Sequence, residues 1–563
     1  MTSSADGDDP QPWHLHRSAA STPSLEVTAA DVAPRPAESY DELRSIIVRA
    51  FSPLVAVYAT EELDDLAAAK GVAGGFTALI RPYGEQVSGK VVVRDSVGAS
   101  RAWDDFAVHF ADLGRLAYDA AAESAEAPQP SAVLAELEQK ISAHSSLMHP
   151  VAAVIAISAS TDQPIDTLRQ LYHQTSHGTR TLPHYANPEY LRYYVLVHDQ
   201  DRDDLAKSTA LFDQMKRHFG LHCHLLKLRS SAASPSDDNA EQLPQCEWLS
   251  PSEDLQYMAD TATLDDLQRP SRPSVSAADA AAIRTFVREL VTQSIVPHME
   301  QRIALWNDQI ASRRRGLSGR FMSISKRWAG LGSATRLSSS SGPSTGNYDS
   351  SQAHYRFDTP EALLGKLADF ALMLRDFKLA ASTLDLVRSD YNNDKAWKYL
   401  AGANEMCCVA NLLNPLTGTA AAKLKMESFD QMLDTACYSY LTRCNDPASA
   451  LRALLLGVEL LKVRGKQGAE LAAKWGIRIL ELGLVGSCGH PLLSERIASC
   501  FAGQIGIGNT GWGTRKRKAA MWSVTAADDW MKLGRAAFAA DALEQANELY
   551  AQVRHGVRDD DFE

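Results

Sequence analysis

LRYYVLVHDQDRDDLAKSTALFDQMKRHFGLHCHLLKL (Leu191–Leu228) is the stretch that decides the fold of this chain. Its first part, Arg192–His198, is a short apolar run typical of a buried strand, and Asp203–Phe219 has the periodicity of an amphipathic helix. Gly220 follows at the position of a helix C-cap, and His222–Leu228 supplies another strand. Strands joined through a helix pair in parallel, so this stretch predicts a βαβ unit.

The residues before this stretch extend the same pattern. Val151–Ser158 is a continuous apolar run suited to a fully buried strand, and a helix is expected around Leu168–His173. Residues 40–229 are therefore predicted to form an N-terminal α/β domain. Asp41–Tyr58 has helical spacing, with Pro53 as a kink or break.

The first residues of the chain differ in composition. Residues 1–39 are rich in Ser, Pro, Ala and Asp and lack periodicity, which predicts a disordered leader. No basic-then-apolar signal peptide is evident there, and no apolar run approaches the ~18 residues of a spanning helix. The sequence therefore predicts a cytoplasmic protein that contacts membranes peripherally.

Helical patterns dominate the second half of the chain. Polar stretches at 230–275 and 333–358 predict a disordered insertion and a flexible linker, and 276–312 between them predicts one long helix with Pro297 inside it. Residues 359–563 carry small and apolar residues at tetratricopeptide-like spacing, which predicts an α-solenoid. The expected fold class is α+β overall and mainly α, with an N-terminal α/β domain followed by a solenoid of helix pairs.

The charge pattern breaks between Gln309 and Asn347. Seven basic residues and no acidic residue lie there, although the whole chain carries a net charge of −12. Apolar residues of the same segment recur at i, i+4, i+7, i+11 and i+14, on one helical face. Residues 313–332 are therefore predicted to be a basic amphipathic helix on an anionic membrane surface. Its membrane-binding residues would be Arg313, Arg314, Arg315, Leu317, Arg320, Phe321, Ile324, Lys326, Arg327, Trp328 and Leu331.

The basic segment has alternative interpretations. A solvated linker, an acidic protein partner or a nucleic acid would also suit a run of arginines. Only two aromatic residues interleave the charges and no RNA-binding motif accompanies them, so the membrane surface is favoured and no nucleic-acid partner is expected.

Patterns that resemble catalytic motifs are discounted. The glycines of GxGxxG (Gly506, Gly508, Gly511) are expected in a loop between helices rather than after a strand, and no phosphate-binding GxxxxGK[ST] occurs. His222 and His224 lack a third ligand at matching spacing, and adjacent Cys407 and Cys408 are typical of core residues. We expect no catalytic residue, no metal and no cofactor.

Five blocks of the chain resemble the large subunit specific to the TRAPP-III vesicle-tethering complex. They are Arg44–Val72, Leu191–Leu228, Ile283–Gly330, Lys366–Leu413 and, less specifically, Arg515–Tyr550. The third block is the most specific, because its elements PHME, LWNDQ and RRGLS are not required by helix formation alone. Members of that family usually continue past the repeats into β-sandwich modules.

The resemblance implies a non-catalytic scaffold. TRAPP-III activates the Rab GTPase of the early secretory pathway on membranes, in ER-to-Golgi transport and autophagosome formation. The small core subunits carry the nucleotide-exchange surface, so they would be the partners of this chain, and the Rab would be reached through the complex. The implied locations are the Golgi, the ER–Golgi interface and the phagophore assembly site. The alternative from the residues alone is an unrelated tetratricopeptide-type adaptor for proteins or RNA.

Overall fold

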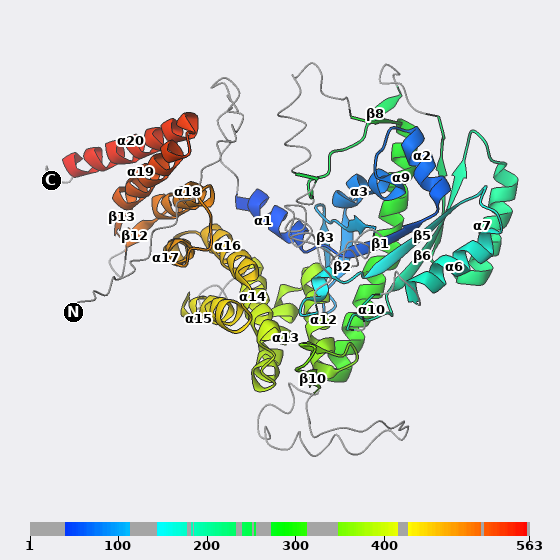
Figure 1. Cartoon of the computed structure of the whole chain (residues 1–563), viewed down its shortest axis with the longest axis horizontal. Helices are drawn as coiled ribbons and strands as arrows, with labels where there is room; N and C mark the ends of the chain where they lie inside the picture. Colours follow the sequence, from blue (N-terminus) through cyan, green and yellow to red (C-terminus); the bar gives the residue numbers. More distant parts are fainter. Residues whose placement is uncertain are drawn as a thin grey trace, which may run out of the picture.

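The computed structural model of the chain describes residues 40–112, 143–176, 182–183, 185–231, 239–249, 253–254, 272–311, 347–414, 426–507 and 512–559. Figure 1 shows two parts, a sheet region and a stack of helices that leads away from it. The fold class predicted from the sequence, α+β with helices predominating, is confirmed.

A parallel sheet of five strands forms the centre of the first part. Its spatial order is β4-β1-β5-β6-β7, and adjacent strands are parallel throughout. The strands are β1 (Leu54–Ala59), β4 (His109–Ala111), β5 (Ala152–Ser158), β6 (Leu191–Asp199) and β7 (Cys223–Leu228). In the register, Val57 pairs with Val154 and Ile155 with Tyr194. The three strands that the sequence predicts, β5 to β7, lie side by side.

Helices cover both faces of this sheet. Ala56, Ile155 and Leu196 point to one face, where they pack with residues of α6 (Pro164–Ser176) and α7 (Leu205–Phe219). Val57, Val154 and Val195 point to the opposite face. That face is covered by α2 (Glu61–Ala69), α3 (Gly75–Glu85) and α9 (Ala277–Glu289). Burial on both faces explains the continuous apolar runs of these strands.

The beginning of the domain differs from the sequence-based expectation. Helix α1 (Tyr40–Ala50) ends before Pro53, and Leu54–Ala59 forms strand β1 instead of continuing the helix. Proline disfavours helical backbone in the residue before it, and a short run that is buried on both faces suits a strand. The apolar residues after Pro53 therefore belong to the sheet.

Four small ribbons lie outside the main sheet in the described part of the chain, and the last of them lies at residues 505–514. β2 (Val91–Arg94) pairs with β3 (Ser100–Trp103), and β10 (Tyr348–Asp349) pairs with β11 (His354–Tyr355). β8 (Ala240–Gln242), which falls in the predicted insertion, pairs with β9 (Ser274–Ser276). Most of 230–275 and all of 1–39 lie outside the described residues, as does the predicted linker up to residue 346.

The residues for which the sequence predicts one long helix are helical from Ala277 to Ala311. α9 is followed by a π-helical turn (Leu290–Ile295), by α10 (Val296–Trp306) and by a second π-helical turn (Asn307–Ala311). Ser276 caps the start, because its hydroxyl accepts a hydrogen bond from the Asp279 amide at 3.1 Å. Pro297 is the second residue after the first π-turn, where the regular hydrogen-bond ladder is already interrupted.

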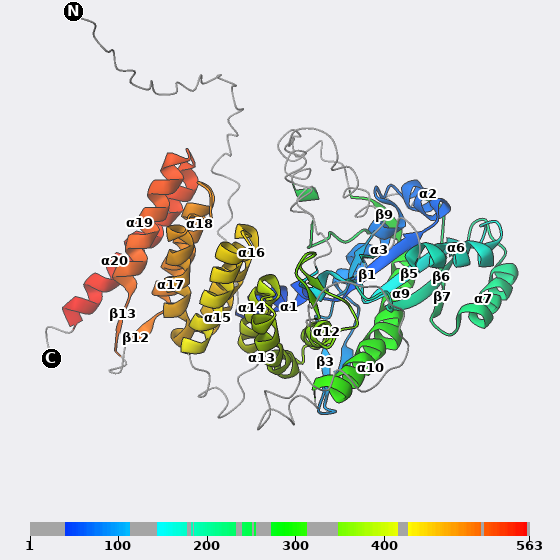
Figure 2. The ribbon, with the colours of Figure 1, turned by 60° about the horizontal axis from the view of Figure 1, so that its bottom comes forward.

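The second part is a stack of helices in which each contacts the next (Figure 2). They are α12 (Pro360–Met373), α13 (Phe377–Asn393), α14 (Trp397–Leu413), α15 (Met426–Tyr438), α16 (Pro447–Val463), α17 (Lys466–Glu481), α18 (Gly489–Ala502), α19 (Lys516–Lys532) and α20 (Ala536–Asp559). One hydrophobic core continues from the sheet through α10 and α12 into this stack. The two parts are therefore packed as one body.

Between α18 and α19 the chain forms a short ribbon rather than the expected glycine-rich loop. β12 (Ile505–Ile507) pairs antiparallel with β13 (Trp512–Thr514). Two of the three GxGxxG glycines lie outside the described residues, and Gly506 lies within β12. A two-stranded ribbon between helices differs from the strand-to-helix turn of a dinucleotide site.

Candidate functional site

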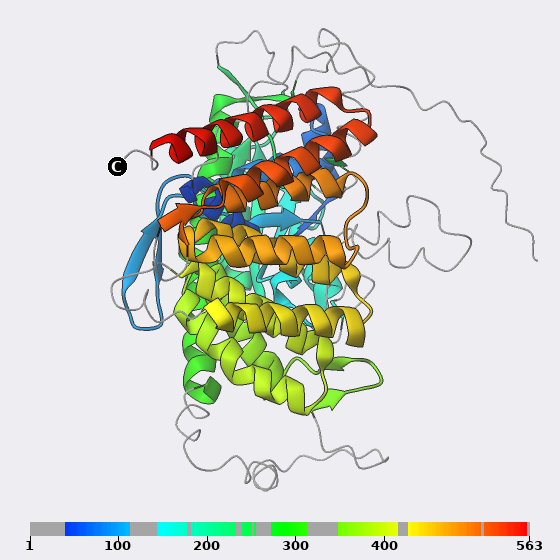
Figure 3. The same cartoon turned by 90° about the vertical axis from the view of Figure 1, so that its left-hand side faces the viewer.

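The predicted membrane-binding residues Arg313, Arg314, Arg315, Leu317, Arg320, Phe321, Ile324, Lys326, Arg327, Trp328 and Leu331 all lie outside the described residues. The described chain stops at Ala311 and resumes at Asn347, just before β10. In Figures 1 and 3, the end of α10 and the β10–β11 ribbon lie toward the same end of the molecule. The basic segment is therefore attached at both of its ends to this part of the structure.

Tyrosines fix the ribbon at which the chain resumes. The buried ring of Tyr355 lies 5.0 Å from that of Tyr348 and 5.0 Å from that of Tyr399, centroid to centroid. The Tyr355 hydroxyl donates a hydrogen bond to Asp394 Oδ2 at 2.9 Å, and the Tyr399 hydroxyl donates one to the Ala143 carbonyl at 2.8 Å. Burial raises the pKa of Tyr399 well above its usual value, so its phenol stays protonated as a donor.

An arginine joins the turn after α12 to the sheet region. The side chain of Arg375, 4% exposed, pairs with the Asp105 carboxylate and donates to the Asp105 carbonyl at 2.8 Å. Its guanidinium also lies 4.6 Å from the centroid of the Trp103 ring. Burial opposes ionisation of Asp105, but the hydrogen bond and charge of Arg375 outweigh it and lower the pKa of this carboxyl.

The backbone at this turn places the arginine. Arg375 has a φ of 64°, in the left-handed region, and the following amide of Asp376 donates to the Ala371 carbonyl at 2.8 Å. This is the geometry with which helices commonly end. Asp376 in turn accepts a hydrogen bond from the Ser96 amide at 2.9 Å, in the loop between β2 and β3. The end of α12 is thus held to two segments of the sheet region.

A half-open cavity of about 310 Å³ lies beside this contact. It is lined by Arg44, Ser45, Val48, Trp103, Asp104, Asp105, Arg375 and Phe377. Arg44 donates a hydrogen bond to the Leu413 carbonyl at 2.9 Å, and Asp105 accepts one from the Ser45 hydroxyl at 2.8 Å. These polar groups already have partners, and the bonds of Arg44 and Arg375 link the two parts beside the cavity.

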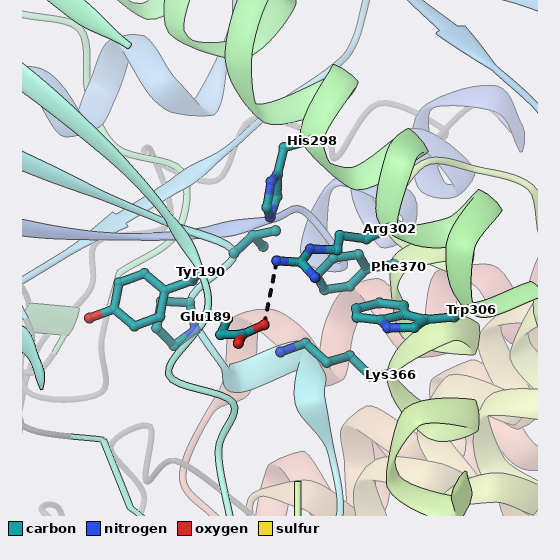
Figure 4. A pocket seen from close by; sticks show the side chains of 9 residues that line it. Glu189, Tyr190, His298, Arg302, Trp306, Lys366 and Phe370 are labelled. Atoms are coloured by element: carbon teal, nitrogen blue, oxygen red, sulfur yellow. Dashed lines mark ion pairs between the residues drawn. The ribbon is translucent and has the colours of Figure 1, made fainter. Parts of the chain in front are cut away.

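A second junction lies where α10, α12 and the amino ends of β5 and β6 meet (Figure 4). α10 contributes His298, Arg302 and Trp306 at intervals of four residues, on one helical face. α12 contributes Lys366 and Phe370, and the segment before β6 contributes Glu189 and Tyr190. The rings of Trp306 and Phe370 lie 5.3 Å apart and form an apolar side of the pocket.

Basic groups predominate in this pocket. Arg302 Nη2 lies 3.6 Å from Glu189 Oε2, and the Lys366 amine points toward the same carboxylate. Burial, with the neighbouring Arg302, lowers the pKa of Lys366 to about 8. Burial and the charge of Arg302 also lower the pKa of His298, to about 4. The sequence alone did not identify these residues as a site. A signal was present, because His298 and Trp306 belong to the PHME and LWNDQ elements, which helix formation alone does not require.

The histidines that the sequence singles out are bonded within the fold. His222 Nδ1 lies 2.9 Å from Ser294 Oγ, and His224 Nδ1 lies 3.0 Å from Glu289 Oε2. Cys407 and Cys408 are both buried in α14. Across the described ranges, no group of three or more His, Cys, Asp or Glu side chains is arranged to hold a metal ion. His222, just before β7, and His224, within it, therefore link this strand to the helical segment 277–295.

Comparisons with known sequences and with a sequence profile point to the same family. The sequence profile described as "ER-Golgi trafficking TRAPP I complex 85 kDa subunit" matches residues 47–137 and 132–465. Transport protein particle subunit trs85-2 of Schizosaccharomyces pombe is 26% identical over 92% of this chain and 89% of its own length. Trafficking protein particle complex III-specific subunit 85 of Saccharomyces cerevisiae is 24% identical over 64% of this chain and 53% of its own length.

The human relative is much longer than the region it shares. Trafficking protein particle complex subunit 8 of Homo sapiens is 26% identical over 64% of this chain, which corresponds to 29% of the human protein. The family profile extends over the sheet region, α10 and the helices up to α16. The chain therefore belongs to the family of large TRAPP-III-specific subunits.

Proposed function

We propose that this chain is a non-catalytic scaffold subunit of a TRAPP-III-like tethering complex, which it directs to membranes in ER-to-Golgi transport and autophagy. The observation that carries the proposal is the single core shared by the sheet region and the helical stack. A scaffold must keep its partner surface and its membrane contact at a fixed separation. Here both would be attached to one body, because the basic segment leaves and rejoins it next to α12.

Partners of the chain would be the small core subunits of the complex, docked on the helical stack. Stacked helix pairs present extended surfaces that commonly bind other proteins. The Rab exchange activity would reside in those subunits, so this chain would position it rather than catalyse exchange. The relatives are themselves described as subunits of transport or trafficking protein particles.

The membrane contact would be the segment 313–332. Partial burial of five apolar side chains contributes ~5 kcal/mol or somewhat more, and the basic groups near anionic lipid add ~1 kcal/mol each. Ordering about fifteen residues costs ~1 kcal/mol each or more, which equals or exceeds that gain. The isolated helix would bind weakly, and attachment to a multi-subunit complex would supply the avidity that makes it effective.

Within the described ranges, no helix combines the length and the apolar character that crossing a bilayer requires. We assign the membrane contact to the basic segment because amphipathic spacing and positive charge coincide there.

Affinity purification of the tagged full-length chain, followed by mass spectrometry, tests the assignment to the complex. The small core subunits are expected in near-stoichiometric amounts with the unmodified chain. The variant with Leu317, Phe321, Ile324 and Trp328 changed to Asp serves as the matched control, and it should recover the same subunits. Recovery of an unrelated set of proteins, without the core subunits, would overturn the proposal.

A further inference from the structure

The pocket of Figure 4 carries more positive charge than its own carboxylate can satisfy. Lys366 is buried, with 8% of its surface exposed, and its ammonium lies 5.6 Å from the centroid of the Phe370 ring, yet it has no hydrogen-bond or ion-pair partner among the residues that the structure describes. A buried cation without a partner costs free energy, so such groups are normally paired. The unpaired ammonium points into the pocket rather than into the core.

Nearby carboxylates do not resolve this imbalance. Asp369, on the same helix, accepts hydrogen bonds from the amide and hydroxyl of Ser146, and burial raises its pKa to about 6. Glu189 Oε2 lies 3.6 Å from Arg302, longer than the ~2.7–2.9 Å of a charge-assisted hydrogen bond. The Glu189 side chain is also 69% exposed, so it can leave the pocket without breaking buried contacts.

The shape of the pocket limits what can enter it. About 200 Å³ of space, part of it open to solvent, lies between the lining residues, and none of it forms a cavity that would hold a water molecule. An incoming anion must therefore take the position of the Glu189 carboxylate. A side-chain carboxylate meets this requirement, because its methylene groups can lie against Trp306 and Phe370 while its oxygens reach Arg302 and Lys366.

We propose that this pocket receives an Asp or Glu side chain from another subunit of the complex, which displaces Glu189 and pairs with Lys366 and Arg302. The inference rests on the proposed function, since it takes the partner to be a complex subunit. Glu189 then acts as an internal competitor that occupies the site while the chain is alone. The pocket would thus be a docking site at the junction of the sheet region and the first helix of the stack.

The test uses biolayer interferometry between the immobilised full-length chain and the complex assembled without it. Lys366→Met keeps most of the length of the side chain and removes its charge, so the dissociation constant should rise at least tenfold. The thermal unfolding midpoint of that variant should stay the same or increase, because an unpaired buried cation has been replaced by an apolar group. Lys378→Met, which removes an exposed lysine on α13, is the matched control and should change affinity less than twofold.

A second variant keeps the test decisive if Lys366→Met does not fold. Glu189→Gln alters an exposed side chain and removes the internal competitor, so binding should become about threefold tighter or more. An unchanged or weaker affinity for Glu189→Gln, or a Lys366→Met variant that binds within twofold of the parent, would overturn the docking site. If the unmodified chain fails to bind the complex at all, the proposed function itself fails and the docking site falls with it.

Discussion

Replacing Arg375 with methionine should loosen the contact between the sheet region and the helical stack. Methionine keeps much of the apolar stem but removes the guanidinium that pairs with Asp105 and lies over Trp103. Breaking a buried ion pair by removing one partner costs ~3–5 kcal/mol. The Asp105 side chain is 31% exposed, so the solvent relieves part of that loss, and we expect a value at the lower end, about 3 kcal/mol.

Hydrogen exchange followed by mass spectrometry measures this opening locally, which suits a chain too large to unfold in one step. Each 1.4 kcal/mol corresponds to about a tenfold change in an equilibrium constant, so amides of β3 and of the turn between α12 and α13 should exchange about 100-fold faster. Peptides of α6 and α7, on the far face of the sheet, should be unaffected.

A matched control separates the effect of burial from that of losing any arginine. Arg356 pairs with Asp358 on the surface, where the two side chains are 70% and 45% exposed. Arg356→Met should therefore change local stability by ~0.5 kcal/mol or less. If Arg375→Met speeds exchange less than threefold at the junction, or speeds it equally in all peptides, the reasoning about this contact is wrong.

Three further perturbations test the described structure. Burial raises the pKa of Asp369 to about 6, above the ~3.9 of an unfolded chain, so the folded state binds the proton more tightly. Stability should fall as the pH rises from about 4 to 6, and Asp369→Asn should remove that contribution from unfolding midpoints measured against pH. Lys70→Met should cost ~3–5 kcal/mol, seen as a lower thermal midpoint, because it leaves Asp279 buried without the ammonium now 2.6 Å away. A midpoint equal to the parent's would contradict this. Gly476→Val should lower the midpoint by the equivalent of ~1–3 kcal/mol, because even a Cβ at this position would lie 2.7 Å from Ile497 on the next helix.

The sequence predicts most of the architecture because period and composition differ sharply between the two parts. Strands β5 to β7 and the helices after Pro360 follow from apolar runs and 3.6-residue spacing. The sequence predicts a helix where strand β1 lies, because six apolar residues that follow a helical segment fit either period. Strand β4 has only three residues, His109–Ala111, and depends on pairing with β1 rather than on a local pattern.

The candidate site was less accessible to sequence reasoning. The basic amphipathic segment 313–332 is visible as a local pattern of charge and spacing, and it stays a prediction. The pocket, in contrast, combines residues from before β6, from α10 and from α12, as far apart as Glu189 and Lys366. Lys366 looked like an ordinary helical lysine in the sequence, because its burial follows only from the packing of α12 against α10.

We propose that segment 313–332 links a tethering complex to membranes. The most direct test of this link is flotation of the assembled complex with liposomes that contain phosphatidylserine and phosphatidylinositol, at physiological ionic strength. The unmodified complex should float with the liposomes, and the complex carrying Leu317, Phe321, Ile324 and Trp328 changed to Asp should stay in the dense fractions with all its subunits. If the substituted complex floats as well as the parent, the segment is not the membrane contact and the account is contradicted.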